Sequence, residues 1–196
     1  GNPAAFSLTH PIFCQAFLAG LDSTHFYSAG SQDCNNKFAV TSRLYGSPAS
    51  QPILDFDNVD CFIIVGSNPA ISHMSFLSVT RPIERLKEIE QKGGKVYFVN
   101  PRKTESARRV GEQVFIRPGT DVFFLLGFLQ ELIASGGIRH DLIEQHMKNW
   151  PAVQQFAQDW TPERVEAVTG ISAEQLRTMV ARYRTAKGGA LYCSTG

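Results

Sequence analysis

Short apolar runs, separated by segments with helical patterns, predict the strands of this chain. The five residues from Cys61 to Val65 form a run that is too short for a core helix and rich in β-branched and aromatic types. This run therefore predicts a strand that is buried on both faces. Further runs predict strands over Lys95–Val99, Val114–Ile116 and Ala190–Cys193.

Helical patterns occupy the segments between and after these runs. Pro82–Gln91 carries apolar residues at helical spacing among charges, which predicts a surface helix covering the sheet. Val122–Ile133 is apolar nearly all round and predicts a buried helix. Further helices are predicted around Leu142, near Val153, from Thr161, and behind a capping box of Ser172 and Gln175.

Strand, helix, strand in this order predicts a right-handed crossover with parallel strands. The predicted fold class is therefore α/β, with a Rossmann-like open parallel sheet and helices on both faces.

The N-terminal part of the chain has weaker signals. His10–Gly20 predicts a short helix with a proline in its first turn and an apolar packing surface. His25–Ser28 predicts a short strand, Gly30–Asn36 a dense polar turn, and Lys37–Tyr45 a further helix.

Composition and charge exclude several classes of partner. With 43% apolar and 19% charged residues, the chain has the composition of a soluble globular protein. The net charge of +1 gives no case for nucleic acid or membrane surfaces as partners. A local basic cluster of Arg102, Lys103, Arg108 and Arg109 is interpreted as a solvated face, with a phosphate site as the alternative.

Targeting and redox signals are also weak. No apolar run approaches the roughly 20 residues of a membrane span, and the N-terminus lacks a signal-peptide layout. A cytoplasmic location is expected, with a periplasmic one left open. The cysteines Cys14, Cys34, Cys61 and Cys193 form no C-x2-C pair, so the chain encodes neither a zinc knuckle nor an iron–sulfur cluster.

The loop after the first predicted strand has the chemistry of a phosphate site. It consists of Gly66, Ser67, Asn68 and Pro69, which offer backbone N–H groups and a hydroxyl without a large side chain in the way. The spacing G-x-G-x-x-G is absent, so an ordinary nicotinamide fingerprint is not supported.

The next two strands also end in polar loops. Asn100 ends the second strand, where the ribose-binding acid of a dinucleotide fold usually lies, and Arg102 follows it. Gly119 and Asp121 follow the third strand. Asp121 is either a carboxylate favoured by a helix N-terminus or a partner for the adjacent N–H donors of guanine.

Together, the stretches GSNPA (66–70), VNPRKTESA (99–107) and IRPGTD (116–121) resemble the nucleotide-binding domain of the molybdopterin oxidoreductases, the dimethyl sulfoxide reductase family. The resemblance covers nearly the whole chain. It implies molybdenum or tungsten bound by two molybdopterin guanine dinucleotides. In that family the loop matching Gly66–Pro69 lies along the pyrophosphate, the Asn100 position meets the ribose, and the Asp121 position meets guanine. Asn100 departs from the usual aspartate.

The resemblance also points to a metal position. In the formate dehydrogenase and nitrate reductase branches, a protein ligand follows an aspartate by six residues, and counting from Asp33 reaches Ala39. Alanine cannot ligate a metal. The alternatives are a metal without a protein ligand, as in the arsenite oxidase branch, or a shifted register in which Cys34 is the ligand. Asp33, Asn35 and Lys37 are expected beside the pterins, or else belong to a solvated turn and helix start.

The expected domain organisation is the end of a neighbouring α/β domain over residues 1–36 and the nucleotide-binding domain over residues 37–196. The chain is thus expected to be a fragment of a larger multidomain enzyme, inactive alone. The parent would transfer electrons and usually an oxygen atom to or from a small substrate. Its 4Fe-4S cluster would lie in a preceding N-terminal part, and its partners would be the remaining domains and an electron-transfer subunit.

Two other functions are compatible with the same residues. One is a stand-alone nucleotide-binding module without redox chemistry, and the other is a purely structural α/β domain.

Overall fold

The structure is a computed structural model that describes residues 7, 9–27, 30, 34–48, 50, 52–73 and 79–194 of the chain. The chain divides into two compact units, Gly1–Pro52 and Ile53–Ser194. The first carries helices α2 (His10–Gly20) and α4 (Asn35–Tyr45). The division leaves the predicted domain boundary after residue 36 a prediction.

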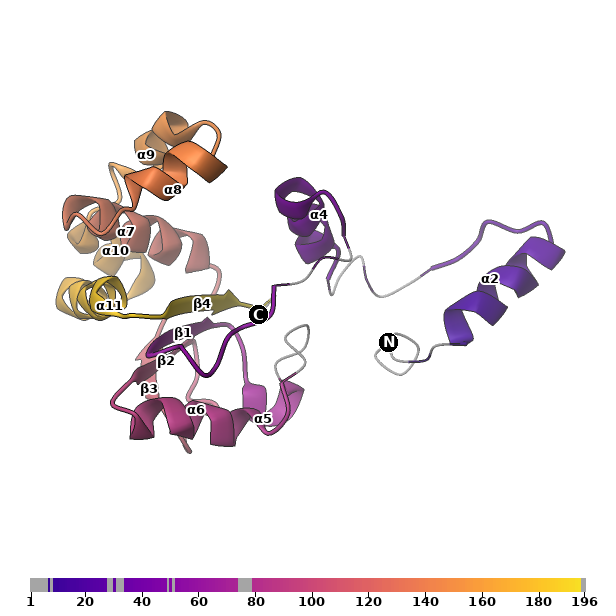
Figure 1. Cartoon of the computed structure of the whole chain (residues 1–196), viewed down its shortest axis with the longest axis horizontal. Coiled ribbons are helices and arrows are strands. Elements are labelled where there is room, and N and C mark those ends of the chain that lie inside the picture. The colour runs from indigo at the N-terminus through magenta and orange to yellow at the C-terminus, as the bar shows by residue number, and fades with distance from the viewer. Residues whose placement is uncertain are drawn as a thin grey trace. The chain divides into compact units, whose positions relative to one another are not determined.

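A four-stranded parallel sheet forms the centre of the second unit (Figure 1). Its strands are β1 (Cys61–Val65), β2 (Lys95–Asn100), β3 (Glu112–Phe115) and β4 (Gly189–Cys193). The order is β3-β2-β1-β4, so β1 has a neighbour on each side. Because all the strands are parallel, their carboxyl ends meet at one edge of the sheet.

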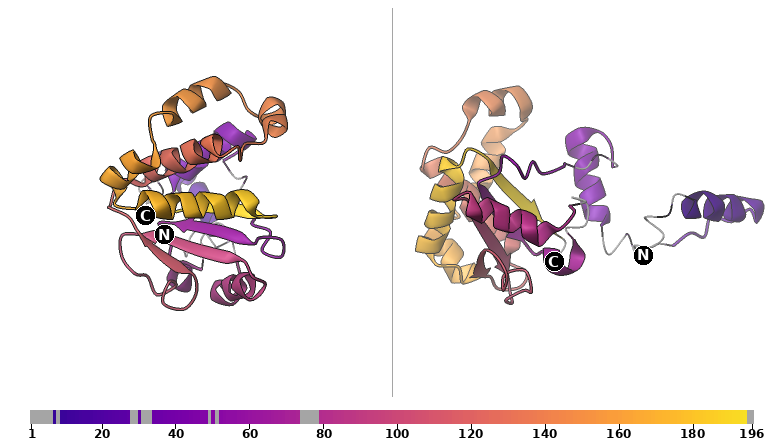
Figure 2. Two further views of the ribbon diagram at one scale, coloured as in Figure 1. Left: turned by 90° about the vertical axis from the view of Figure 1, so that its left-hand side faces the viewer. Right: turned by 60° about the horizontal axis from the view of Figure 1, so that its bottom comes forward.

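Helices cover both faces of this sheet (Figures 1 and 2). The helices of this unit are α5 (Pro69–Ser72), α6 (Pro82–Gln91), α7 (Asp121–Ala134), α8 (His140–His146), α9 (Trp150–Ala157), α10 (Pro162–Thr169) and α11 (Ala173–Thr185). Helix α6 lies on one face, and α7 and α11 lie on the other, with α10 packed against both of these. Helix α9 packs against α7. The predicted α/β class, an open parallel sheet with helices on both faces, is confirmed.

Alternate residues of β1 supply two separate hydrophobic cores. Phe62 and Ile64 face the α6 side, where they join the buried Leu86. Ile63 and Val65 join the core on the opposite face. Side chains at successive strand positions point to opposite faces, so two-sided burial requires an uninterrupted apolar run. The prediction that Cys61–Val65 is buried on both faces is confirmed.

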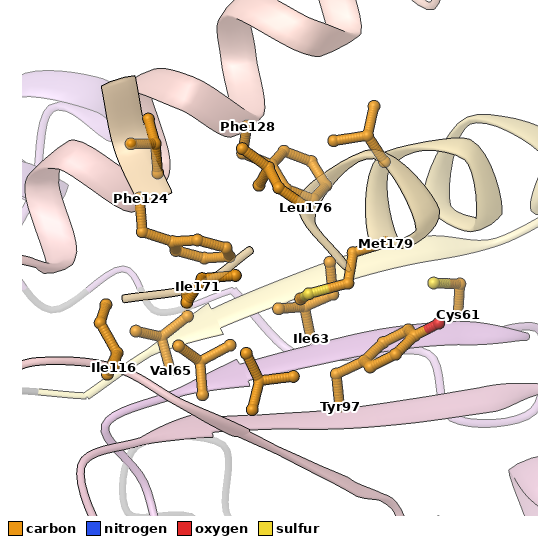
Figure 3. Packing of buried hydrophobic residues seen from close by; sticks show 14 residues of the cluster. Cys61, Ile63, Val65, Tyr97, Ile116, Phe124, Phe128, Ile171, Leu176 and Met179 are labelled. Atoms are coloured by element: carbon orange, nitrogen blue, oxygen red, sulfur yellow. The ribbon is translucent and has the colours of Figure 1, made fainter. Parts of the chain in front are cut away.

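The core beneath α7 and α11 is built from aromatic and long aliphatic side chains. Figure 3 shows Phe124 and Phe128 of α7, with Leu176 and Met179 of α11, gathered over Ile63. Full burial of side chains of this size contributes about 1.5–3 kcal/mol each, as an upper estimate. Helix α11 is thereby held directly on the sheet.

Most predicted elements occur with small shifts at their ends. The strand Cys61–Val65 and the helix Pro82–Gln91 have the predicted bounds, while the second strand extends to Asn100. The capping box also occurs, since the Ser172 hydroxyl accepts a hydrogen bond from the Gln175 N–H at 3.1 Å.

Three expectations are wrong. The predicted strand over His25–Ser28 is absent from residues 25–27, and Ser28 lies outside the described residues. The helix predicted over Val122–Ile133 exists, but only Phe124, Gly127 and Phe128 of α7 are buried, and Val122 is 54% exposed. The apolar residues of α2 do not pack within the described part of the chain, where none of them is buried.

Within the described residues, every helix is too short or too polar to pass through a lipid bilayer.

Gly127 permits the close approach of α7 and α10. A Cβ atom at this position would lie 2.3 Å from Cγ2 of Val165, which is fully buried. We expect Gly127→Ala to lower the free energy of unfolding by about 1–3 kcal/mol through overpacking, measured by urea denaturation. Val165→Ala should relieve the clash, so the double variant should be more stable than the sum of the two single effects predicts. Additive effects, or an unchanged urea midpoint in Gly127→Ala, would contradict this packing.

Candidate functional site

Three loops lie at the carboxyl edge of the sheet: the first follows β1, the second follows β2 and the third follows β3. They surround a cavity of about 540 Å³. A cavity of this size matches the ligand pockets that open α/β sheets place outside their strand ends. Its wall also includes Ser194, directly after β4. Seven of the residues predicted from sequence line it, namely Gly66, Ser67, Asn68, Asn100, Arg102, Gly119 and Asp121.

Two glycines allow the chain to turn at this edge. Gly66 and Gly119 have φ values of +64° and +77°, in the left-handed region where a side chain is strained. Gly66 directly follows β1, at the start of the loop that leads to α5. Gly119 lies within the loop between β3 and α7, close to the start of that helix. Pro69 is the first residue of α5 and is buried, so among the predicted loop residues it has a packing role.

The Asn68 side chain is used for contacts within the protein. Its Oδ1 accepts hydrogen bonds from the Ser106 N–H at 3.2 Å and the Ser106 hydroxyl at 2.7 Å. Its Nδ2 donates to the Glu105 carboxylate at 2.6 Å. The Ser106 hydroxyl in turn accepts from the Ala70 N–H at 2.9 Å. Asn68 therefore joins the first loop to the second.

The Asn100 side chain connects the second loop back to the first. It is 8% exposed, and its Nδ2 donates to the Ser67 carbonyl oxygen at 3.1 Å. Among the described residues its Oδ1 has no hydrogen-bond partner. One acceptor of this buried amide is thus left for a group inside the cavity.

Further donors without a protein acceptor lie in the first loop. The Ser67 hydroxyl and the backbone N–H groups of Ser67 and Asn68 have no acceptor among the described residues. Ser67 is 5% exposed and lines the cavity. Buried donors are normally paired, so this loop can accommodate an anionic oxygen acceptor.

Asp121 lies at the other side of the cavity as the first residue of α7. The side chain of the preceding Thr120 makes no capping hydrogen bond to α7, and its hydroxyl donates to the Arg117 carbonyl at 2.7 Å. The Arg117 guanidinium donates to the Ala167 carbonyl at 2.7 Å, which ties this loop to α10. Asp121 therefore presents a carboxylate on a loop held by its neighbours.

The charge of Arg102 is largely balanced by Glu105, since their side chains approach to 3.2 Å. The pKa of Glu105 is lowered from its ordinary value of 4.5 to about 2. Hydrogen bonds from its own backbone N–H, from Arg102 and from Asn68 cause this shift, in that order. Glu105 is thus a permanent anion that holds Arg102 and Asn68.

The residues predicted near the metal belong to the first unit. Cys34 precedes α4 as its N-cap, and Asn35 and Lys37 lie in its first turn. Ala39 is an exposed residue of the same helix, and Asp33 lies outside the described residues. In the described part of the chain, no three His, Cys, Asp or Glu side chains are grouped as metal ligands would be.

Sequence comparison finds relatives among curated proteins, although no family model matches the chain. The chain is 28% identical to formate dehydrogenase H of Escherichia coli, over 75% of the chain and 20% of that protein. It is 32% identical to nitrate reductase of Symbiobacterium thermophilum, over 63% of the chain and 17% of that protein. These relatives confirm the resemblance to the molybdopterin oxidoreductases, the dimethyl sulfoxide reductase family. The chain spans about a fifth of the length of these two relatives.

The fold also recurs in a solved structure. Acetylene hydratase from Pelobacter acetylenicus superposes with a TM-score of 0.71 over 89% of this chain and 23% of that chain. The sequence identity is 20%, so this likeness concerns the fold alone. The same fold thus forms about a quarter of the acetylene hydratase chain.

Sequence analysis missed three residues that shape the site. Glu105 and Ser106 hold Asn68, and Thr104 lines the cavity with only 2% of its surface exposed. In the sequence, Thr104, Glu105 and Ser106 form a run of three polar residues shortly after the end of β2. This run could have been predicted to belong to the ligand-binding loop that begins at Asn100.

The pKa of Glu105 provides a test of the Asn68 contacts. Because the pKa is depressed in the folded state, the carboxylate stabilises the fold above pH 4.5, and this contribution is lost as the pH falls towards about 2. We expect Asn68→Ala to raise the Glu105 pKa towards 4.5, measured by NMR titration of its carboxyl carbon. Glu163, whose pKa is lowered mainly by Arg177, is the internal control and should titrate unchanged. An unchanged Glu105 midpoint would contradict the Asn68–Glu105 contact.

Proposed function

We propose that this chain binds the guanosine-pyrophosphate part of a molybdopterin guanine dinucleotide. The observation that carries the proposal is the arrangement of donors and acceptors around one cavity. Ser67 and Asn68 offer donors on the first loop, while Asn100 and Asp121 offer acceptors on the other two. A pyrophosphate requires donors, a ribose hydroxyl requires an acceptor, and the two adjacent N–H donors of guanine require a carboxylate.

The fit to this group is chemical, and it assigns a task to each residue. The N–H groups of Ser67 and Asn68 would bind phosphate oxygens. Asn100 would accept a hydrogen bond from the ribose, and Asp121 would select guanine. Gly119 allows the positive φ of +77° that the third loop adopts, and Arg102, paired with Glu105, would offer its remaining N–H group to the ligand from the wall of the cavity. When bound, the cofactor supplies a redox-active metal, while these residues hold its nucleotide end.

The activity of the whole protein follows as a proposal from the family. We infer that the longer protein is a molybdenum or tungsten bis-molybdopterin guanine dinucleotide oxidoreductase that transfers electrons, and usually an oxygen atom, on a small substrate. Residues 1–36 would end a neighbouring domain, and residues 37–196 would form the nucleotide-binding domain. A 4Fe-4S cluster would lie in a preceding part, and an electron-transfer subunit would be a partner, in the cytoplasm or the periplasm.

Asp33, Asn35 and Lys37 would contact the pterins. With alanine at position 39, the metal would have no protein ligand from this segment, and Cys34 stays the alternative ligand.

A stand-alone nucleotide-binding module without redox chemistry would use the same cavity. It differs from the leading proposal in predicting no molybdenum or tungsten in the native protein.

Selective binding of guanine nucleotides tests the cavity directly. We expect the 196-residue chain to bind GDP more tightly than ADP in an NMR titration, because ADP lacks the paired donors that match Asp121. Asp121→Asn should weaken GDP binding on the order of tenfold, because an amide offers one acceptor and one mismatched donor. Asp159→Asn, an exposed aspartate outside the cavity, is the matched control and should leave GDP binding unchanged. Equal affinity for GDP and ADP would overturn the guanine assignment.

Metal analysis tests the redox proposal. The native protein that contains this chain, purified without air, should contain molybdenum or tungsten and should release a fluorescent oxidised pterin on denaturation. Metal analysis that finds neither element, together with selective GDP binding, would favour the stand-alone nucleotide-binding module.

A further inference from the structure

Two asparagines connect the first and second loops in opposite directions. Asn68 reaches from the first loop to Glu105 and Ser106, and Asn100 reaches from the end of β2 to the Ser67 carbonyl. Both residues line the cavity. The positions of the two loops are therefore coupled through side-chain amides rather than through the sheet alone.

The contact from Asn100 fixes the orientation of one peptide group. In a trans peptide the C=O of one residue and the N–H of the next point in opposite directions. Holding the Ser67 carbonyl therefore also sets the direction of the Asn68 N–H. This N–H has no acceptor among the described residues, which leaves it available to a ligand.

We propose that Asn100 is a positioning residue for phosphate binding, because its Nδ2 holds the Ser67–Asn68 peptide with the N–H ready for a phosphate oxygen. The inference rests on the proposed guanosine-pyrophosphate site. It gives Asn100 two tasks, since Oδ1 remains available for the ribose while Nδ2 orients the loop.

An aspartate could not perform the positioning task. A carboxylate has no proton to donate, and at 3.1 Å it would face the Ser67 carbonyl oxygen with like partial charge. Asn100 is 8% exposed, so water would screen this repulsion poorly. Asparagine at this position therefore gives a ribose contact without the charge assistance of a carboxylate, but its Nδ2 can hold the Ser67–Asn68 peptide in place.

The affinity ratio of GDP to guanosine separates the two tasks. A residue that only binds ribose affects both ligands equally, so the ratio stays constant. If Asn100 positions the phosphate loop, Asn100→Ala should lower the ratio about tenfold, because the pyrophosphate loses a preset donor. Asn58→Ala, which removes an exposed amide bonded to Asp55, is the matched control and should preserve the ratio.

Asn100→Asp adds a readout that a general loss of structure would not produce. At neutral pH this nearly isosteric variant should have a lower GDP-to-guanosine affinity ratio than the wild type. At lower pH the ratio should return towards that of the wild type at the same pH, because the protonated carboxyl can donate to the Ser67 carbonyl. Asn100→Ala should show no such recovery.

The possible failures are distinguishable. GDP binding by the wild type with an unchanged ratio in both variants would overturn the positioning role alone. A wild-type chain that binds neither GDP nor guanosine would overturn the proposed function together with this inference.

Discussion

The burial of β1 on both faces is the constraint on which the rest of the second unit depends. Phe62, Ile63 and Ile64 are all fully buried, which requires a helical layer on each side of the sheet and a neighbouring strand at each edge of β1. The crossover through α6 covers one face, and α7 and α11 cover the other. Parallel strands joined by helical crossovers provide a helical layer on each face of the sheet. Because the strands are parallel, their carboxyl ends and the loops that follow them lie at one edge.

The loops at that edge divide their hydrogen-bonding groups between the protein and the cavity. The Asn68 side chain is engaged with Glu105 and Ser106, and one half of the Asn100 amide is engaged with Ser67. Among the described residues, the Ser67 and Asn68 N–H groups of the first loop remain as donors, and Asn100 and Asp121 of the second and third loops remain as acceptors. Such a gradient across one cavity matches an elongated ligand that is anionic at one end and rich in donors at the other.

Much of this arrangement could be predicted from sequence. An apolar run of five residues predicted the bounds of β1, and apolar residues at helical spacing among charges predicted those of α6. The parallel-strand rule then brought Gly66, Asn100 and Asp121 to one cavity, although they are far apart in the chain.

The rest depends on tertiary contacts that a local pattern does not contain. The partner of Asn68 lies 37 positions along the chain, so the sequence could not show that its amide serves the protein rather than a ligand. Val122 was expected inside because its neighbours are apolar, but it is exposed in the first turn of α7. The exposed apolar residues of α2 show the same limit, since apolarity does not specify which surface covers it.

NMR mapping of bound GDP on the 196-residue chain tests most directly whether the cavity is a guanosine-pyrophosphate site. The backbone amide signals of Ser67, Asn68 and Asp121 should shift together with increasing GDP, and guanine protons should show NOEs to the start of α7. Shifts confined to residues that do not line the cavity, such as Tyr97 and Glu112, would contradict the assignment. So would the absence of any shift at millimolar GDP.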